Sequence, residues 1–360
     1  MHTMTPDSQS QDLSLTRFAR FTGMRALAWS GDVLYASRGY QLLRTRIQNP
    51  VNEVRWDTVG RFRPALRRRV SVLTGLSSRL FRDGFHALAV LPSGGLVAAV
   101  PGAIVTLHNG EGSFRTTHNI TRGTRPLHIT AAPNGTVYWG EYFDNAAREE
   151  VRIYASADGG TTWSVACTFP QGAVRHVHNI VHDPWGECLW ILTGDYGDEC
   201  RILRASLDMR QIDTVLQGNQ QARAVAFVPM EDGLYFSTDT PLEKNYIYRL
   251  DRSGSLKRLA DISSSSIYGC RVQDQVFFST MVEPSEVNPD SNVRIFGGGG
   301  DQWSALLAWR KDPWPMRFFQ YGNAFLPDGN NTTPYLAVST IAVCSDDQAT
   351  SLYSVDRIAR

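Results

Sequence analysis

Short runs of hydrophobic residues, separated by turn residues, are the most regular pattern along this chain. The runs are rich in Val, Ile, Leu, Tyr, Phe and Trp, and Gly, Asp, Asn and Pro lie between them. Long stretches with the spacing of an amphipathic helix are scarce. Because short apolar runs bounded by turn residues are typical of β-strands, the pattern predicts an all-β chain.

The hydrophobic runs occur in similar pairs, which indicates an internal repeat. In each pair a second run follows the first after a short turn. Six pairs are clear: 24–29 with 33–37, 85–90 with 96–100, 127–132 with 137–141, 177–182 with 189–193, 222–227 with 234–238, and 267–272 with 276–280. We expect a seventh copy near Tyr321.

The spacing of the copies predicts a β-propeller. A unit of about 40 to 50 residues with about four strands cannot bury both faces of its sheet alone, so such units stack radially around a channel. We therefore predict a single domain over residues 1–360 with seven four-stranded blades. The N-terminal segment, residues 1–22, is expected to supply the outer strand of the last blade and close the ring. Residues 282–303, which contain Gly297 to Gly300, predict a long loop, which is either a lid or a disordered surface segment.

One turn carries a motif that is known from other propellers. Residues 156–163, Ser-Ala-Asp-Gly-Gly-Thr-Thr-Trp, match the Asp-box, S-x-D-x-G-x-T-W. On this motif the chain resembles sialidase-like, Asp-box (BNR) repeat propellers of the carbohydrate-active type. In these proteins the Asp-box forms the turn between the third and fourth strands of a blade. Its usual role is structural, so the resemblance implies a fold rather than a reaction.

Composition and charge exclude several classes of protein. Lys plus Arg (36) and Asp plus Glu (35) nearly cancel, which argues against a nucleic acid or an anionic membrane as partner. The first 20 residues lack the apolar core of a secretory signal, and no apolar run is long enough to span a bilayer, which predicts a cytoplasmic protein. The five cysteines form no CxxC pair, which argues against a disulfide framework. A closed propeller needs no partner for stability, so we expect a monomer.

The repeat predicts a polar ring on one face of the propeller. The first strand of each blade runs along the channel, so residues near the starts of these strands converge. The aligned position is polar in every blade, and the predicted ring comprises Arg25, His86, His128, His178, Arg223, Tyr268 and Tyr321. Loops after the second strands overhang the same face and carry acids, among them Glu141, Asp195, Asp239 and Glu283.

Three interpretations of the ring histidines stay open. The imidazoles of His86, His128 and His178 would suit a divalent transition metal such as Mn, Fe or Zn. In a metal-free site, His128 or His178 would move a proton while arginines bind a substrate carboxylate. In the third interpretation the histidines only form hydrogen bonds in a hydrated channel.

These observations predict a carbohydrate-active enzyme, a lyase or a glycoside hydrolase, that acts on an anionic or uronate-containing oligosaccharide or polysaccharide at the channel face. The predicted catalytic residues are His128, His178, Tyr268, Glu141 and Asp195. The predicted substrate-binding residues are Arg25, Arg223, His86, Tyr321, Asp239 and Glu283. Pairs among the acids keep a two-carboxylate glycosidase open, whereas a single Asp-box argues against a sialidase. The alternative is a non-catalytic propeller that binds a glycan or a protein partner.

Overall fold

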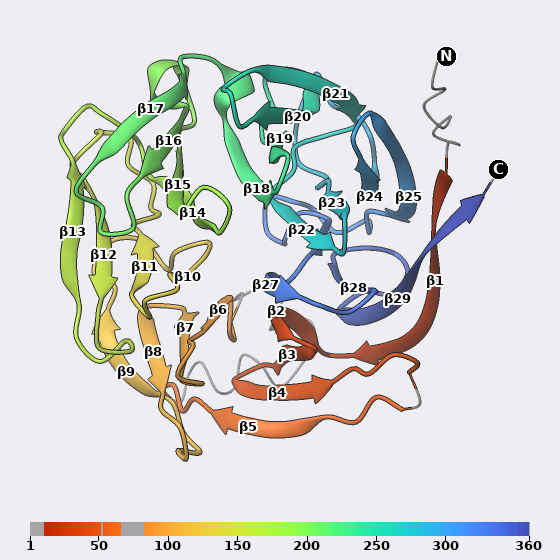
Figure 1. The fold of residues 1–360 in the computed structure, drawn as a ribbon, viewed down its shortest axis with the longest axis horizontal. Helices are drawn as coiled ribbons and strands as arrows, with labels where there is room; N and C mark the ends of the chain where they lie inside the picture. The colour runs from red at the N-terminus through yellow and green to blue at the C-terminus, as the bar shows by residue number, and fades with distance from the viewer. Residues whose placement is uncertain (1–10, 52, 66–82, 360) are drawn as a thin grey trace, which may run out of the picture.

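The computed structural model describes residues 11–51, 53–65 and 83–359, and strands make up nearly all of their regular structure. Within these ranges, two short 3-10 helices, η1 (Gly197–Glu199) and η2 (Gln220–Ala222), are the exceptions. The strands form seven sheets around a central channel, which makes the fold a seven-bladed β-propeller (Figure 1). The prediction of an all-β propeller with seven four-stranded blades is confirmed.

The blades are numbered in chain order and described from the channel outward. Blades 1 and 2 contain β2 (Arg25–Gly31), β3 (Val33–Arg38), β4 (Gln41–Arg46) and β5 (Asp57–Arg61), then β6 (Ala87–Val90), β7 (Leu96–Val100), β8 (Ala103–Leu107) and β9 (Arg115–Asn119). Blades 3 and 4 contain β10 (Thr130–Ala131), β11 (Val137–Gly140), β12 (Val151–Ser156) and β13 (Ser164–Phe169), then β14 (Val177–Asp183), β15 (Cys188–Thr193), β16 (Arg201–Ala205) and β17 (Ile212–Gln217).

The remaining three blades follow the same plan. Blades 5 and 6 contain β18 (Ala224–Met230), β19 (Gly233–Thr238), β20 (Asn245–Asp251) and β21 (Leu256–Ile262), then β22 (Tyr268–Val272), β23 (Gln275–Ser279), β24 (Asn292–Gly299) and β25 (Gln302–Arg310). Blade 7 contains β26 (Asn323–Phe325), β28 (Tyr335–Ile341), β29 (Ala349–Ala359) and β1 (Gln11–Thr22). An additional strand, β27 (Asp328–Asn331), pairs in parallel with β2 on its channel side.

Hydrophobic clusters between neighbouring blades form the core. Tyr138 and Ile153 of blade 3, for example, are buried together with Ile180 and Leu189 of blade 4. Equivalent clusters join the other neighbouring pairs of blades, including blade 7 with blade 1. Each sheet therefore buries both of its faces, as the repeat length requires.

The two ends of the chain meet in blade 7. Strand β1 pairs antiparallel with β29 from Gln11↔Ala359 to Thr22↔Ala349, and Figure 1 shows them side by side in red and blue. The segment expected to close the ring thus contributes the outermost strand of the last blade. Residues 1–10 of that segment lie outside the described residues.

The long loop expected over 282–303 needs correction. Strand β24 occupies Asn292–Gly299 and β25 begins at Gln302, so the irregular segment ends at Ser291. Gly297 and Gly298 lie in β24, where aromatic rings pack against them, whereas Gly300 lies in the turn before β25 with a φ of +55°. A Cβ at Gly297 would lie 2.7 Å from the ring of Phe277. Gly297 and Gly298 therefore serve close packing, and a loop or lid over the whole range is excluded.

The Asp-box forms the turn between β12 and β13, the third and fourth strands of blade 3. Oδ1 of Asp158 accepts hydrogen bonds from Ser156 Oγ at 2.8 Å and from the backbone N–H groups of Thr161 and Thr162 at 3.0 and 2.9 Å. Trp163 packs against the cluster between blades 2 and 3. The motif thus has a structural role in this chain.

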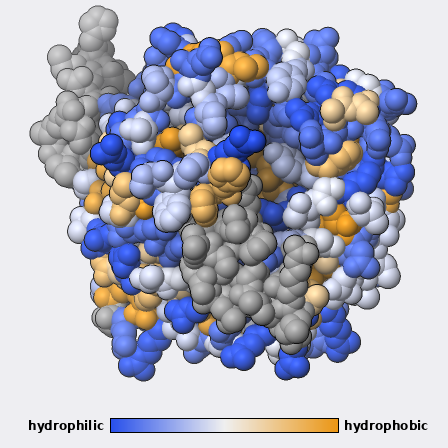
Figure 2. Space-filling view, turned by 180° about the vertical axis from the view of Figure 1, so that it is seen from behind, coloured by the Kyte–Doolittle hydropathy of each residue, from blue (hydrophilic) through white to orange (hydrophobic). Residues whose placement is uncertain are grey.

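The surface and the thiols add two observations. The face shown in Figure 2 is mostly hydrophilic, and its hydrophobic residues lie in small separate groups. All five cysteines are free. In the described part of the chain, no helix has the length and hydrophobicity needed to cross a membrane.

Closure of the ring by β1 is testable by truncation. A chain that starts at Gly23 lacks β1 and exposes the edge of β29, so we expect a lower melting temperature and association at high concentration. A synthetic peptide of residues 11–22 should restore the melting temperature, whereas a scrambled peptide should not. Circular dichroism and light scattering measure both effects. An unchanged melting temperature without the peptide would contradict this role of β1.

Candidate functional site

The predicted ring residues lie near the starts of the innermost strands. Arg25 and Tyr268 begin β2 and β22, His178 is the second residue of β14, His86 and Arg223 directly precede β6 and β18, and His128 and Tyr321 lie two residues before β10 and β26. We call the face at which these strands begin the upper face. Contacts divide the ring residues into two clusters.

The channel cluster comprises Arg25, His86, His128, Tyr268 and Asp328. Arg25 Nη1 lies 3.3 Å from His86 Nδ1, and Arg25 also hydrogen bonds with Tyr268. His128 Nδ1 lies 2.9 Å from Asp328 Oδ2, and the His128 and Tyr268 rings are 6.0 Å apart. Burial lowers the pKa of Arg25, while the charges of Tyr268 and Asp328 oppose this shift. Each charged group of this cluster therefore already has a partner in the chain.

Sequence reasoning missed Asp328. It begins β27, the strand inserted between β26 and β28 of blade 7 and paired with β2 of blade 1. The other blades have no equivalent strand in the described ranges, so an alignment of repeats has no position for it. The signal available was the Asp-Gly-Asn-Asn sequence at 328–331, which reads as a turn.

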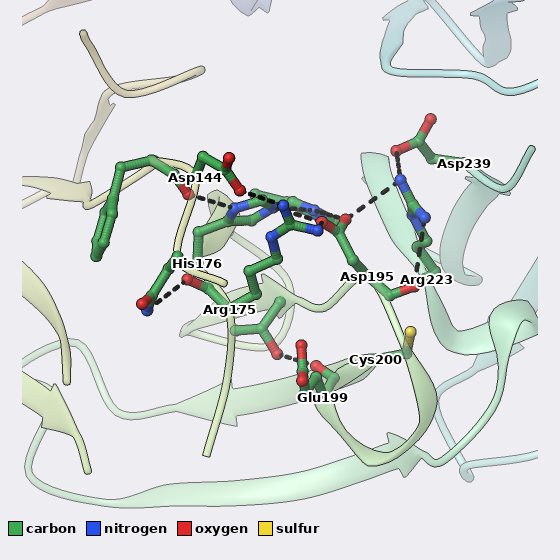
Figure 3. Close-up of polar contacts among 12 residues, drawn as sticks. Asp144, Arg175, His176, Asp195, Glu199, Cys200, Arg223 and Asp239 are labelled. Atoms are coloured by element: carbon green, nitrogen blue, oxygen red, sulfur yellow. Dashed lines mark hydrogen bonds and ion pairs between the residues drawn. The ribbon is translucent and has the colours of Figure 1, made fainter. Parts of the chain in front are cut away.

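The second group, here called the Asp195 cluster, lies at the upper face where blades 3, 4 and 5 meet (Figure 3). It comprises Tyr142, Arg175, His176, His178, Asp195, Arg223 and Asp239. The histidines come from the start of β14, and the acids follow the ends of β15 and β19. The start of a first strand and the end of a second strand lie at the same face, which brings these side chains together.

The carboxylate of Asp195 is the centre of this cluster. Its Oδ1 lies 3.3 Å from His178 Nε2 and 3.2 Å from Arg223 Nη2. Its Oδ2 lies 3.5 Å from His176 Nε2 and 3.2 Å from Arg175 Nη1. Burial works to raise the pKa of Asp195, but the histidines and Arg223 outweigh it and hold the pKa well below its usual range. Asp195 is therefore a fixed negative charge.

The two histidines of β14 are oriented by backbone carbonyls. His176 Nδ1 lies 3.1 Å from the carbonyl oxygen of Phe143, and His178 Nδ1 lies 3.0 Å from that of Ala224. Since a carbonyl oxygen only accepts hydrogen bonds, each Nδ1 carries a proton, and in the neutral ring each Nε2 has a lone pair. The two Nε2 atoms are 3.0 Å apart and both face Asp195.

Asp239 behaves differently from Asp195. Its residue is only 7% exposed, and its closest charged contact is Arg223 Nη2, 3.5 Å from Oδ2. No donor in the described part of the chain hydrogen bonds with this carboxylate. Burial raises the pKa of Asp239 to about 6, against the opposing charge of Arg223. Asp239 can therefore gain or lose a proton near neutral pH, while Asp195 stays ionised.

Two further buried atoms near Asp239 have no partner among the described residues. These are Nε of Arg223 and Oε1 of Glu283. Burial also raises the pKa of Glu283. Buried polar atoms without partners are rare in folded proteins, so this position suits a polar group of a bound ligand.

Other predicted site residues lie apart from the Asp195 cluster. Glu141 is 4% exposed and pairs with the guanidinium of Arg122, and it accepts a hydrogen bond from the backbone N–H of Arg152 at 2.9 Å. These contacts are those of a structural acid. Within residues 83–359, no hydrogen bond or ring contact joins Tyr321 to either cluster.

The structure does not bring His86, His128 and His178 together as a metal centre. His86 contacts Arg25, His128 contacts Asp328, and His178 belongs to the Asp195 cluster. Arg25 and Arg223, predicted to hold one carboxylate together, likewise belong to different clusters. The three histidines come from consecutive blades, but each side chain contacts a different partner, so equivalent positions in the repeat do not bring them to one point.

The channel contains a cavity of about 560 Å³. It begins at His128 and Asp328 and extends to the opposite ends of the innermost strands, where Trp185 and Arg271 line it. The guanidinium carbon of Arg271 lies 5.0 Å from the centre of the Trp185 ring. The cavity is thus separate from the residues of the Asp195 cluster.

Comparisons with known proteins support the fold. No family model and no curated protein matches this chain. A chain of a nidogen/laminin complex has a TM-score of 0.52 at 11% identity, over 84% of this chain and 98% of that one. A catalytically inactive virginiamycin B lyase from Staphylococcus aureus, solved with quinupristin, has a TM-score of 0.57 at 10% sequence identity. The match covers 96% of this chain and 99% of the lyase. A chain of the mitotic checkpoint complex has a TM-score of 0.57 at 9% sequence identity. The match covers 98% of this chain and 99% of that one.

At such low identity these likenesses show the propeller fold alone. The similar structures include a lyase as well as assemblies named for complexes between proteins. The resemblance to sialidase-like proteins therefore stays confined to the Asp-box turn.

The raised pKa of Asp239 predicts how its replacement changes stability. Asp239 keeps its proton up to about pH 6 in the folded state, whereas in the unfolded state it loses the proton above its pKa of about 4. Its contribution to the free energy of unfolding is therefore fully present below about pH 4 and is lost as the pH rises through about 6. Asp239→Asn should therefore be nearly neutral at pH 4 and stabilising by about 3 kcal/mol at pH 8. Urea unfolding in a chelating buffer measures the difference.

Asp213→Asn is the matched control, because Asp213 is exposed on β17. As a substitution of an exposed residue, it should change the free energy of unfolding by less than about 0.5 kcal/mol. An Asp239→Asn variant that is less stable than the wild type at pH 8 would show that Asp239 is ionised and well paired in the folded protein.

Proposed function

We propose that this chain is an enzyme that performs acid–base chemistry on an anionic, uronate-containing glycan at the upper face. The Asp195 cluster is its active site, and it catalyses an elimination, as lyases do. Asp239 exchanges the proton, and Arg223 and Arg175 bind the negative charge of the substrate.

The observation that carries this proposal is the contrast between two neighbouring acids. Asp195 and Asp239 both contact Arg223 Nη2, at 3.2 and 3.5 Å, yet their pKa values are shifted in opposite directions. Environments that separate the pKa values of adjacent groups are typical of acid–base active sites. A carboxyl group with a pKa of about 6 is mostly ionised at neutral pH and can accept a proton. Once protonated, it gives that proton up readily.

Anion binding follows from the two arginines. The Nε atoms of Arg223 and Arg175 are both buried, and neither has a hydrogen-bond partner among the described residues. Guanidinium N–H groups in this state suit a carboxylate, which accepts two parallel hydrogen bonds. The carboxylate of a uronic acid is such a group, and its α-proton is the one that an elimination removes.

The elimination balances with the residues at hand. The carboxylate of Asp239 takes the proton at C5 of the uronate, while the arginines stabilise the negative charge that develops on the substrate carboxylate. The bond between C4 and the glycosidic oxygen then breaks as a C4–C5 double bond forms. The leaving oxygen receives a proton from water or from protonated Asp239.

Hydrolysis is a second candidate, favoured by Glu283. A glycoside hydrolase needs two available carboxyl groups, and both oxygens of Asp195 are occupied by a histidine and an arginine. Glu283, with its unpartnered Oε1, is the remaining partner for Asp239. The product separates the two reactions, because only elimination leaves an unsaturated sugar.

A non-catalytic role is favoured by the channel cavity. Its mouth combines Trp185, which is 37% exposed, with Arg271 stacked on the ring. An aromatic face beside a cation can hold a sugar ring without any reaction. In that case replacement of Trp185 would abolish binding, and replacement of Asp239 would leave it unchanged.

Replacement of Asp239 tests the proposed reaction. The purified chain is incubated with uronate-containing oligosaccharides, and unsaturated products are followed by ultraviolet absorbance while new reducing ends are counted. We expect Asp239→Asn to lower kcat by about 10²- to 10⁴-fold, the usual contribution of a general base. Asp213→Asn should retain full activity. In the wild type, kcat/KM should fall about tenfold per pH unit below pH 6.

Three results would contradict the proposal. One is the absence of turnover on any uronate-containing glycan, and another is full activity of Asp239→Asn. The third is a product without a double bond, which would favour hydrolysis by Asp239 and Glu283.

A further inference from the structure

The Asp195 cluster contains three ligand atoms that face one common point. Nε2 of His176, Nε2 of His178 and a carboxylate oxygen of Asp195 all lie within 4.8 Å of one another. The three residues are 5%, 2% and 7% exposed. Such a combination of two imidazoles and one carboxylate is a common ligand set for transition metals.

The Nδ1 protons of the two histidines leave both Nε2 atoms to be bridged to each other and to Asp195 by a cation, which is either a proton or a metal ion. Each Nδ1 donates its proton to a backbone carbonyl oxygen, that of Phe143 or Ala224. The two Nε2 atoms lie 3.0 Å apart and both face a carboxylate, so without a proton between them their lone pairs would repel, and a metal ion can take the place of that proton. Metal-binding histidines typically show this pattern, in which the second ring nitrogen donates to a carbonyl oxygen and fixes the ring.

The distances agree with a coordination shell. Bonds of about 2.1 Å at angles of about 90° to 110° place neighbouring ligand atoms about 3.0 to 3.4 Å apart. The observed separations are 3.0 Å between the Nε2 atoms, 3.3 Å from His178 Nε2 to Asp195 Oδ1 and 3.5 Å from His176 Nε2 to Asp195 Oδ2. One carboxylate oxygen and the two Nε2 atoms lie within 4.8 Å of one another, so a single ion can reach all three after small movements of the side chains.

The surrounding charges also leave room for a divalent cation. The two arginines contribute two positive charges, and the neighbouring carboxylates contribute four negative charges when ionised. The carboxylates belong to Asp144, Asp195, Asp239 and Glu283. The net charge is then two negative units, which one divalent ion neutralises.

We propose that His176, His178 and Asp195 bind one divalent first-row transition ion, such as Zn²⁺ or Mn²⁺. Three protein ligands leave coordination positions open, which is typical of a catalytic rather than a structural metal centre. The role of the ion rests on the proposed function: it would bind the substrate carboxylate beside Asp239 and acidify the proton α to it. Binding of the ion itself does not depend on that function.

Metal binding by the full chain tests the inference. The purified protein is treated with a chelator, dialysed, and titrated with Zn²⁺ and Mn²⁺ with elemental analysis of the bound fraction. We expect one ion per chain. His176→Gln and His178→Gln should weaken binding by at least about 100-fold, beyond the loss typical of an outer-shell partner. His128→Gln is the matched control and should bind like the wild type.

A second measurement avoids reliance on variants that fail to fold. Co²⁺ added to the wild type should give the visible absorption bands of a site with nitrogen and oxygen ligands, and Zn²⁺ should displace it. Nuclear magnetic resonance of the imidazoles should show two Nδ1–H tautomers when Zn²⁺ is bound. The proposal is overturned if the wild type binds no more ion than folded His178→Gln, or if one ring stays an imidazolium with excess Zn²⁺.

Activity assays separate this inference from the proposed function. Turnover that persists unchanged in the chelated protein removes the catalytic role of the ion but leaves the acid–base function in place. One bound ion per chain without turnover on any uronate contradicts the function and leaves the metal site in place.

Discussion

Every blade of this protein must cover two hydrophobic faces, and only neighbouring blades can cover them. This requirement makes the ring continuous, and it explains why hydrophobic clusters lie between blades rather than within them. It also fixes the site, because sheets stacked around one axis bring the starts of all their innermost strands to one face. Among the polar residues at these starts, His178 and Arg223 meet Asp195 at this face.

The Asp195 cluster illustrates how one carboxylate organises its surroundings. Asp195 contacts two histidines and two arginines and therefore holds side chains from the starts of β14 and β18 in one place. Both oxygens are thereby engaged, so Asp195 cannot serve as a nucleophile. Asp239, on the next blade, lacks such contacts and has the opposite pKa shift. The division of roles between a positioning acid and a reacting acid follows from this difference in contacts.

The sequence predicted the fold and the ring positions because both depend on local repetition. His178 and Arg223 were identified from their places in the repeat, and Asp195 and Asp239 from their places after second strands. Their partners were not predictable, because contacts between blades depend on the direction in which each side chain points, and the position in the repeat does not give that direction. Arg25 and Arg223 illustrate this, since they occupy equivalent positions and belong to different clusters. Asp328 was missed because it lies on a strand that the repeat lacks, and Gly297 was misread because composition cannot distinguish a flexible glycine from a packed one.

The pairing of β1 with β29 has a mechanical consequence. Gln11 pairs with Ala359, so both ends of the chain leave the molecule at the same end of one strand pair. A force that pulls the two termini apart would load these hydrogen bonds one at a time, as in a zipper, rather than all together as in shear. Blade 7 would still be tethered to blade 1 by the parallel pairing of β27 with β2 on the channel side. The propeller is thus weak to tension at its rim and reinforced near its axis.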